Sequence, residues 1–315
     1  MDVTKRSSYT SFIQEVDAPI FHQPWWLDVV CGVDGWDYVS EVNGDRTIAV
    51  WPYHQKSKGG ISYITIPALT PYLGPWYRVP DSLTKQTSIV GFHQQLQQKL
   101  ISKLPSVSLA HYQWHTSHKE YMSMYWAGYQ QTSRFTLHID LRQPKEALWA
   151  ALKDRQRNKI RNAQASSEAT LDGSIEAFWS ANQETFRRQE MEVPYAKAMF
   201  MQLDKELARR DQRRIIMVIE DNQVSGGIYL IHDNSTAYLL ATGRHQSSHA
   251  VAFAIWTGIL WAKEQGLHTF DFEGSMMKGI STFFQSFGGR RVSYPRFSIA
   301  ENIFWDRLYK LIGKL

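Results

Sequence analysis

The stretch that most constrains the fold is residues 236–273, where a strand, a helix and a second strand follow one another. Residues 236–242 (TAYLLAT) form an apolar run of strand length, and Gly243 then allows a sharp turn. Apolar residues recur at helical spacing over 249–265, and the short segment 269–272 (TFDF) follows. Because a helix between two strands of one sheet usually makes them parallel, this stretch predicts one parallel unit of an α/β protein.

The predicted helix start makes the end of the first strand a candidate ligand site. The first N–H groups of a helix have no partner within the helix and carry partial positive charge, which favours an anionic or carbonyl group. Ser247 or Ser248 can also supply the N-cap oxygen. The residues expected to bind a co-substrate here are Thr242, Gly243, Ser247, Ser248, His249 and Ala250.

The remaining pattern predicts two α/β halves, residues 1–142 and 143–315. The first half has a hairpin around Asn43-Gly44-Asp45, a helix and further strands. The elements predicted in the second half are helices at 145–165, 171–188, 195–210, 279–287 and 302–315, and strands at 215–220, 224–231 and 291–297. No repeat between the halves can be read residue by residue.

Composition sets outer limits on the class of protein. The 315 residues are 43% hydrophobic and 21% charged, which is ordinary for a globular chain with a sizeable core. No apolar run reaches the about 20 residues that span a bilayer, and the first residues lack the apolar core of a secretory signal. We therefore expect a cytoplasmic protein without a membrane span. The net charge of +5 favours anionic partners such as sugar nucleotides, CoA or RNA.

Metal and cysteine chemistry are not expected. Cys31 is the only cysteine, so an internal disulfide and a cysteine-ligated metal are excluded, and a buried structural thiol is the simplest interpretation. His111, His115 and His118 span a predicted strand and turn without a well-placed acidic ligand, and we interpret them as ordinary polar histidines.

Several segments resemble one known family. Residues 270–297 (FDFEGSMMKGISTFFQSFGGRRVSYPRF) resemble the C-terminal signature of GNAT-fold acyltransferases of the FemAB-like group, which includes peptidoglycan-bridge and polysaccharide-biosynthesis enzymes. Residues 21–30 (FHQPWWLDVV), 67–77 (PALTPYLGPWY) and 149–163 (WAALKDRQRNKIRNA) resemble the same group, so the resemblance covers most of the chain. It implies an α/β (α+β) protein of GNAT fold, with two tandem GNAT-like halves and mixed sheets.

The resemblance also implies N-acyl transfer, in which an amine attacks an activated ester or thioester. Such a reaction needs a general base. Asp271 and Glu273 end the second strand of the parallel unit, and strand alternation predicts that they share a face, so they are the expected catalytic residues. The alternative is a capping or ion-pair role. Lys278, Arg290 and Tyr294 lie in the same motif and are candidates for binding the acceptor or the oxyanion.

Two further segments are candidate substrate contacts. Arg157 and Arg161 lie in a basic helix that recurs beside the cleft in the family, although a solvated helical face explains the charges equally simply. Tyr72 and Trp76 lie in a proline-rich aromatic loop that forms either a wall of the cleft or a packed connection.

The identity of the acyl donor stays open between two classes. In GNAT enzymes the pyrophosphate of CoA meets a glycine-rich loop, but residues 244–250 contain no glycine. FemAB-like transferases that use aminoacyl-tRNA resemble FKxxF where this chain has Phe283 to Phe287, with Phe284 at the lysine position.

We expect acyl-CoA as co-substrate, no permanently bound cofactor, and an amine of a cell-envelope or polysaccharide precursor, such as a sugar nucleotide, as acceptor. The alternatives are an aminoacyl-tRNA-dependent transferase and a non-catalytic GNAT-fold binding module.

Overall fold

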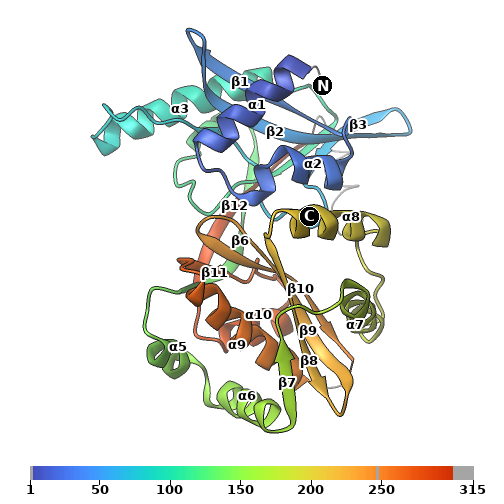
Figure 1. The fold of residues 1–315 in the computed structure, drawn as a ribbon. Coiled ribbons are helices and arrows are strands. Elements are labelled where there is room, and N and C mark those ends of the chain that lie inside the picture. Colours follow the sequence, from blue (N-terminus) through green and yellow to red (C-terminus); the bar gives the residue numbers. More distant parts are fainter. Residues whose placement is uncertain (1–2, 246–247, 301–315) are drawn as a thin grey trace. The chain divides into compact units, whose positions relative to one another are not determined.

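A computed structural model describes residues 3–245 and 248–300 of the chain (Figure 1). Contacts divide the chain into two compact units: unit 1 is Met1–Arg134 with Ser293–Leu315, and unit 2 is Phe135–Val292. These units are defined by contacts, and the two GNAT-like halves expected at 1–142 and 143–315 stay a prediction as domains.

Unit 1 is built on a sheet with the strand order β1-β2-β3-β5-β12, and β4 pairs with β2. β1 and β2 form the predicted hairpin, and Leu96 and Leu100 of α3 belong to the same core as Trp51 and Trp114. The elements are α1 Val3–Glu15, a 3-10 helix Ile20–His22, α2 Pro24–Cys31, β1 Trp36–Asn43, β2 Arg46–Lys58, β3 Ile61–Thr65, β4 Trp76–Tyr77, α3 Gln86–Lys103, β5 Leu109–Gln113, α4 Met122–Trp126, and β12 Arg290–Ala300, which begins in unit 2.

Unit 2 is built on a sheet with the strand order β6-β11-β10-β9-β8-β7. β10 and β11 are parallel, and their other neighbours in this sheet are antiparallel. The elements are β6 Gln130–Asp140, which begins in unit 1, α5 Lys145–Ala151, α6 Asp154–Ser166, β7 Ser167–Thr170, α7 Ile175–Arg187, α8 Lys197–Arg209, β8 Arg213–Glu220, β9 Gln223–His232, β10 Thr236–Arg244, α9 Ser248–Glu264, β11 Thr269–Asp271 and α10 Lys278–Gln285.

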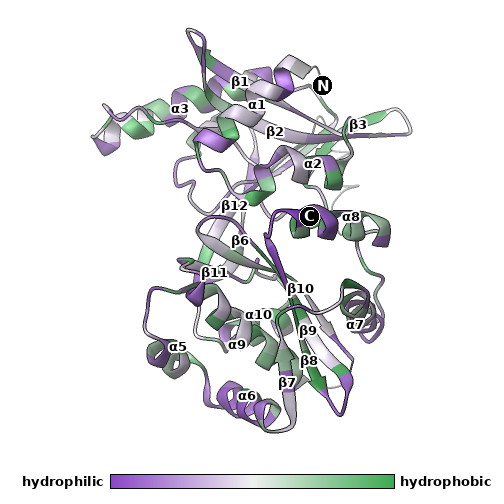
Figure 2. Cartoon of the chain, in the orientation of Figure 1, coloured by the Kyte–Doolittle hydropathy of each residue, from purple (hydrophilic) through white to green (hydrophobic). Residues whose placement is uncertain are grey.

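Helices α9 and α7 cover opposite faces of this sheet. On one face, Gly258 of α9 lies so close to Ile228 and Leu230 of β9 that a Cβ there would come within 2.7 Å of the Leu230 side chain. On the other face, Phe178 of α7 packs on Tyr229, with ring centroids 5.5 Å apart. Neighbouring residues of a strand point to opposite faces, so β9 is buried on both sides. Figure 2 shows β8 to β10 in largely hydrophobic colours and α6 in hydrophilic ones.

The predicted parallel unit is confirmed, since β10, α9 and β11 follow one another as expected. One prediction was wrong: residues 145–165 form two helices, because Leu152 and Lys153 are extended between α5 and α6. The helix α1 and the edge strand β7 were not predicted. The helix predicted at 302–315 lies outside the described residues.

Arg157 explains why the chain breaks between these two helices. Its guanidinium donates to the carbonyls of Ala150 (3.0 Å) and Leu152 (2.7 Å) at the end of α5, and it pairs with Asp154. The cation therefore satisfies carbonyl groups that the end of a helix leaves without partners.

We predict that Arg157→Met lowers the free energy of unfolding by about 1–2 kcal/mol, because uncapped carbonyls lose charge-assisted hydrogen bonds. Arg161→Met, an exposed position of the same helix, is the control and should cost less than half as much. Urea unfolding measures both. Equal losses would contradict the capping role.

Candidate functional site

The candidate site is the place where β10 and β11 part. The two strands pair from Thr236 with Thr269 to Tyr238 with Asp271. β11 then ends, whereas β10 continues to Arg244. The register of β10 against β9 changes between Leu239 and Ala241. Beyond Tyr238, the edge of β10 that faces β11 has no strand partner within the described part of the chain. A gap opens there at the carboxyl ends of two parallel strands, which is where α/β folds place their ligands.

Two side chains of α7 occupy this open edge of β10. Asn182 Nδ2 donates to the carbonyl of Thr242 (2.8 Å), and the N–H of Arg244 donates to Thr185 Oγ1 (2.8 Å). The N–H of His245, the next residue, donates instead to the carbonyl of Ser225 in β9 (3.1 Å). The backbone N–H and C=O groups of the even-numbered residues therefore face the gap. A ligand with an extended amide chain cannot pair with the backbone at these two positions unless α7 moves.

The residues expected to bind the co-substrate surround the start of α9. Gly243 packs under α7, where a Cβ would lie 2.8 Å from Ala181 Cβ and 3.0 Å from a backbone nitrogen. Thr242 points its carbonyl to the gap, and His249 and Ala250 lie in the first turn of α9 and line a small pocket of about 130 Å³. Ser247 and the side chain of Ser248 lie outside the described residues.

Asp271 is a buried carboxylate with at least three partners. It accepts hydrogen bonds from the Thr136 hydroxyl and from the N–H of Glu273 (2.8 Å), and its Oδ2 lies 3.1 Å from His138 Nε2. Burial by itself raises the pKa of Asp271, but these partners outweigh it and hold the pKa below the usual value of an aspartate. Asp271 is therefore fixed as an anion that shapes the end of β11.

Glu273 has the opposite environment. It follows β11 in a left-handed backbone conformation (φ 53°), so the strand alternation that predicted a shared face with Asp271 stops before it. The residue keeps some exposed surface, but its Oε1 is covered and has no hydrogen-bond partner among the described residues. Burial, and then the charge of Asp271, raise the pKa of Glu273 well above its usual value. Two adjacent carboxyl groups with pKa values pushed apart are typical of acid–base chemistry.

Two cations of α6 and one of β10 influence each other electrostatically. Lys159 and Arg155 lie one turn apart on α6, and Arg244 ends β10. Burial lowers the pKa of Lys159, and the charges of Arg155 and Arg244 lower it further. Such a cluster, here called the basic cluster, suits a phosphate group. The sequence predicted substrate contacts on this basic helix, but it predicted Arg157 and Arg161. Sequence alone did not show which face of α6 lies toward β10.

The predicted residues Arg157 and Arg161 point elsewhere on α6. Arg157 caps α5, as described above, and the guanidinium of Arg161 lies over the ring of Trp149 at 5.5 Å. Their predicted role in substrate binding stays a prediction, as do those of Lys278, which is exposed at the start of α10, and of Arg290, which is exposed at the start of β12.

The predicted aromatic contacts belong to unit 1. Tyr72 is fully buried and packs edge-to-face on Tyr294, with centroids 4.9 Å apart. Trp76 donates its indole N–H to the carbonyl of Val16 (3.2 Å). This packing agrees with the alternative of a packed connection, and a role in substrate binding stays a prediction.

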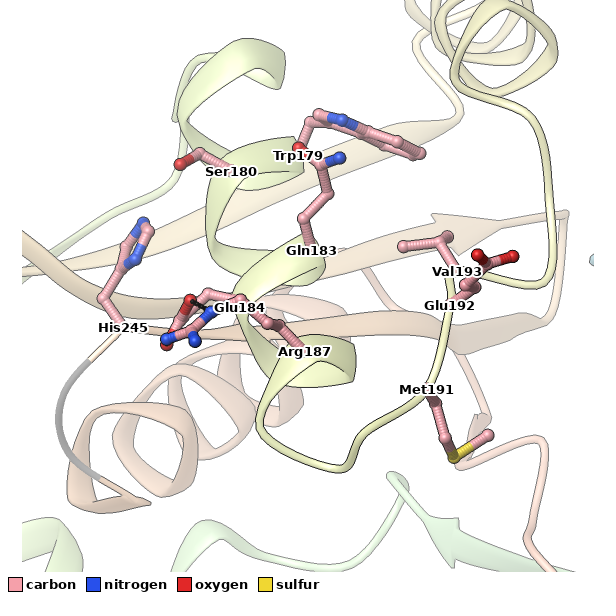
Figure 3. Close-up of a pocket in the computed structure, with 9 residues that line it drawn as sticks. All are labelled: Trp179, Ser180, Gln183, Glu184, Arg187, Met191, Glu192, Val193 and His245. Atoms are coloured by element: carbon pink, nitrogen blue, oxygen red, sulfur yellow. Dashed lines mark hydrogen bonds and ion pairs between the residues drawn. The ribbon is translucent and has the colours of Figure 1, made fainter.

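An open pocket of about 590 Å³ lies on the far side of α7 from the sheet (Figure 3). Trp179, Gln183 and Arg187 form one stripe of α7, and Met191 to Val193 of the following loop stand opposite. Trp179 also packs on Tyr195, at 6.1 Å between centroids.

No group of three or more His, Cys, Asp or Glu among the described residues could hold a metal ion. Among the same residues, no helix is long and apolar enough to cross a membrane.

Comparison with known proteins defines the class of unit 2. Residues 151–283 match the family model described as an acetyltransferase (GNAT) domain, and no curated protein matches the chain. The matched residues include α7, β10, α9 and β11, which surround the gap. This part of the chain is therefore a GNAT acetyltransferase domain, and the protein is an enzyme, an acyltransferase.

Three solved structures share the fold at low identity. The chain resembles FemX with a TM-score of 0.68 and 12% identity over 99% of both chains. It resembles the C-terminal domain of a putative lysylphosphatidylglycerol synthetase from Agrobacterium fabrum with a TM-score of 0.56 and 10% identity, over 99% of this chain and 96% of that one. A tandem GNAT protein from the clavulanic acid biosynthesis pathway gives a TM-score of 0.50 and 10% identity, over 88% and 94%. The expected fold class, a GNAT fold with mixed sheets, is confirmed.

The raised pKa of Glu273 predicts a pH-dependent cost in stability. The folded state holds the proton more tightly than the unfolded state, so stability falls as pH rises above the usual pKa of a glutamate. We therefore predict that the melting temperature of Glu273→Gln exceeds that of the unmodified protein increasingly from pH 5 to pH 8.

Glu184→Gln is the matched control, because hydrogen bonds from Arg187 and Arg188 lower the pKa of Glu184 to about 2. Its carboxylate stabilises the fold fully above the usual glutamate pKa, so from pH 5 to pH 8 this variant should be less stable than the unmodified protein by a constant amount. Parallel curves for the two variants would contradict the environment assigned to Glu273.

Proposed function

We propose that the protein transfers an acyl group to an amine of a cell-envelope or polysaccharide precursor, with acyl-CoA as donor and Glu273 as general base. The observation that carries the proposal is Glu273 Oε1, which is covered and has no hydrogen-bond partner among the described residues, just after β11 and beside the gap of a GNAT acetyltransferase domain. The resemblance of the fold to a putative lysylphosphatidylglycerol synthetase domain supports an acceptor of the cell envelope.

The proposed reaction moves two protons and one acyl group. An ammonium group first gives a proton to the Glu273 carboxylate, and the nitrogen lone pair then attacks the acyl carbonyl carbon. The bond from that carbon to the leaving sulfur or oxygen breaks with its electron pair, and the second amine proton leaves with that atom. A base with a raised pKa suits this role, because proton transfer is most effective near the working pH.

The basic cluster suits the phosphates of the donor. Arg155 and Lys159 belong to α6 and act electrostatically with Arg244 at the end of β10, and the start of α9, which follows β10 in the chain, adds the partial positive charge of a helix N-terminus. CoA and tRNA both carry phosphate, so this feature supports a phosphorylated donor of either class.

Aminoacyl-tRNA is the second candidate donor. The capping of Thr242 and Arg244 by Asn182 and Thr185 favours it, because an aminoacyl ester needs no extended amide chain along β10. The absence of glycine from residues 244–250 points the same way.

We predict that Glu273→Gln lowers turnover by at least about a hundredfold, because the amide cannot take the proton. The assay measures transfer of a labelled acyl group from acetyl-CoA, and separately from aminoacyl-tRNA, to amino sugars and nucleotide-linked amino sugars. Glu192→Gln, an exposed position of the same unit, is the control and should keep its turnover. Turnover of a folded Glu273→Gln variant within a few fold of normal would remove Glu273 as the base.

We predict that Lys159→Ala and Arg244→Ala each raise the KM for the donor about tenfold and reduce its salt dependence, because each removes a charge facing phosphate. Lys205→Ala on α8, an exposed lysine, is the control. Steady-state kinetics at two salt concentrations, with each donor in turn, measure the effect. Unchanged KM values for the donor that reacts would contradict the proposed phosphate site.

A further inference from the structure

A chain of hydrogen bonds fixes the orientation of one amide at the gap. The carbonyl of Thr242 can only accept, so the group of Asn182 that lies 2.8 Å from it must be the NH₂. The amide oxygen of Asn182 then points the other way, where the Tyr195 hydroxyl lies 3.0 Å from it. The backbone of β10 thus decides which atom Asn182 offers to Tyr195.

The same series of hydrogen bonds determines whether the Tyr195 hydroxyl acts as a donor or an acceptor toward the gap. An amide oxygen only accepts, so the phenol proton of Tyr195 is directed to Asn182. The lone pairs of the phenol oxygen remain, and they are hydrogen-bond acceptors. Trp179 and Phe200 pack on the ring, with centroids 6.1 Å and 5.5 Å from it, and they hold it in place.

Glu273 stands on the other side of this gap. Asn182 is bonded to the β10 edge that faces β11, and Glu273 follows the end of β11. Burial raises the pKa of Tyr195, and the charge of Glu273 raises it further, which agrees with the placement of the two residues on the two sides of the gap. Glu273 Oε1 is a covered acceptor without a partner among the described residues.

We propose that Tyr195 and Glu273 together bind the ammonium group of the acceptor, and that Asn182 is the positioning residue that aims Tyr195. An ammonium group has N–H donors and no acceptor, which matches two oxygens that only accept from it. The inference rests on the proposed function, which assigns Glu273 as the base but gives no role to Tyr195 or Asn182.

Binding at this site should release a proton. In the free protein, burial and then the charge of Asp271, which is paired with His138, shift the Glu273 carboxyl toward its protonated form, and the phenol of Tyr195 offers no cation to oppose this. A bound ammonium favours the carboxylate, so the proton leaves Glu273 as the cation arrives.

The experiment is calorimetric titration of the protein with n-butylammonium chloride at pH 7, in two buffers of different ionisation enthalpy, with n-butanol as the neutral probe. The unmodified protein should bind the cation with release of up to one proton and should not bind the alcohol. Tyr195→Phe keeps the ring and removes the oxygen, so its affinity should fall about tenfold. Glu273→Gln should abolish proton release.

Tyr229→Phe is the matched control, because Tyr229 is another buried tyrosine of unit 2 whose hydroxyl bonds to Asp204 (2.7 Å). Asn182→Leu tests the positioning role and should weaken binding as Tyr195→Phe does, with no further loss in the double variant. A structural role of Tyr195 alone would lower the melting temperature without changing the affinity or the released proton.

The outcomes separate this inference from the proposed function. Absence of n-butylammonium binding, or equal affinity in Tyr195→Phe and Tyr229→Phe, overturns the ammonium site even where acyl transfer is measured. Binding that depends on Tyr195 and Glu273, without acyl transfer from acetyl-CoA or aminoacyl-tRNA, supports the site and counts against the proposed function.

Discussion

The site depends on the parting of β10 from β11. A parallel pair that stayed together to its end would cover the Thr242 carbonyl and the Arg244 N–H and leave no room for a ligand. Because β11 stops at Asp271, the edge of β10 is free for side chains of α7, and the chain after β11 is free to leave extended geometry. Gly274, at φ 70°, is required there, since a Cβ would lie 2.0 Å from the carbonyl oxygen of Phe135.

The two carboxyl groups near the end of β11 differ in their environments: that of Asp271 favours the charged form, and that of Glu273 favours the neutral form. Asp271 has at least three partners and is held as an anion, whereas Glu273 has a covered oxygen without a hydrogen-bond partner among the described residues and is held toward its neutral form. The arrangement costs folding free energy at Glu273, because its covered Oε1 has no hydrogen-bond partner among the described residues. A substrate cation is the partner that would offset this cost. Glu273 is therefore both the proposed base and a residue that destabilises the fold when no substrate is bound.

The fold near the site could be predicted because its signals are local. Apolar periodicity and Gly266 were enough to place β10, α9 and β11 within one or two residues, although Gly243 lies inside β10 and not at the predicted turn. The break between α5 and α6 contains no glycine or proline that would mark it in the sequence. It is capped by the side chain of Arg157, and apolar periodicity does not reveal such a contact. Asp271 and Glu273 were located by their place after a strand. Asn182 and Tyr195 were not, because their roles depend on which side of α7 faces β10.

The most direct test of this account is the titration of the Glu273 carboxyl carbon by ¹³C NMR, assigned by its loss in Glu273→Gln. We predict that this resonance titrates well above the usual pKa of a glutamate in the empty protein, and that n-butylammonium moves its midpoint to lower pH. A resonance that titrates at the usual pKa, and does not respond to the cation, would contradict the assignment of Glu273 as the base beside an ammonium site.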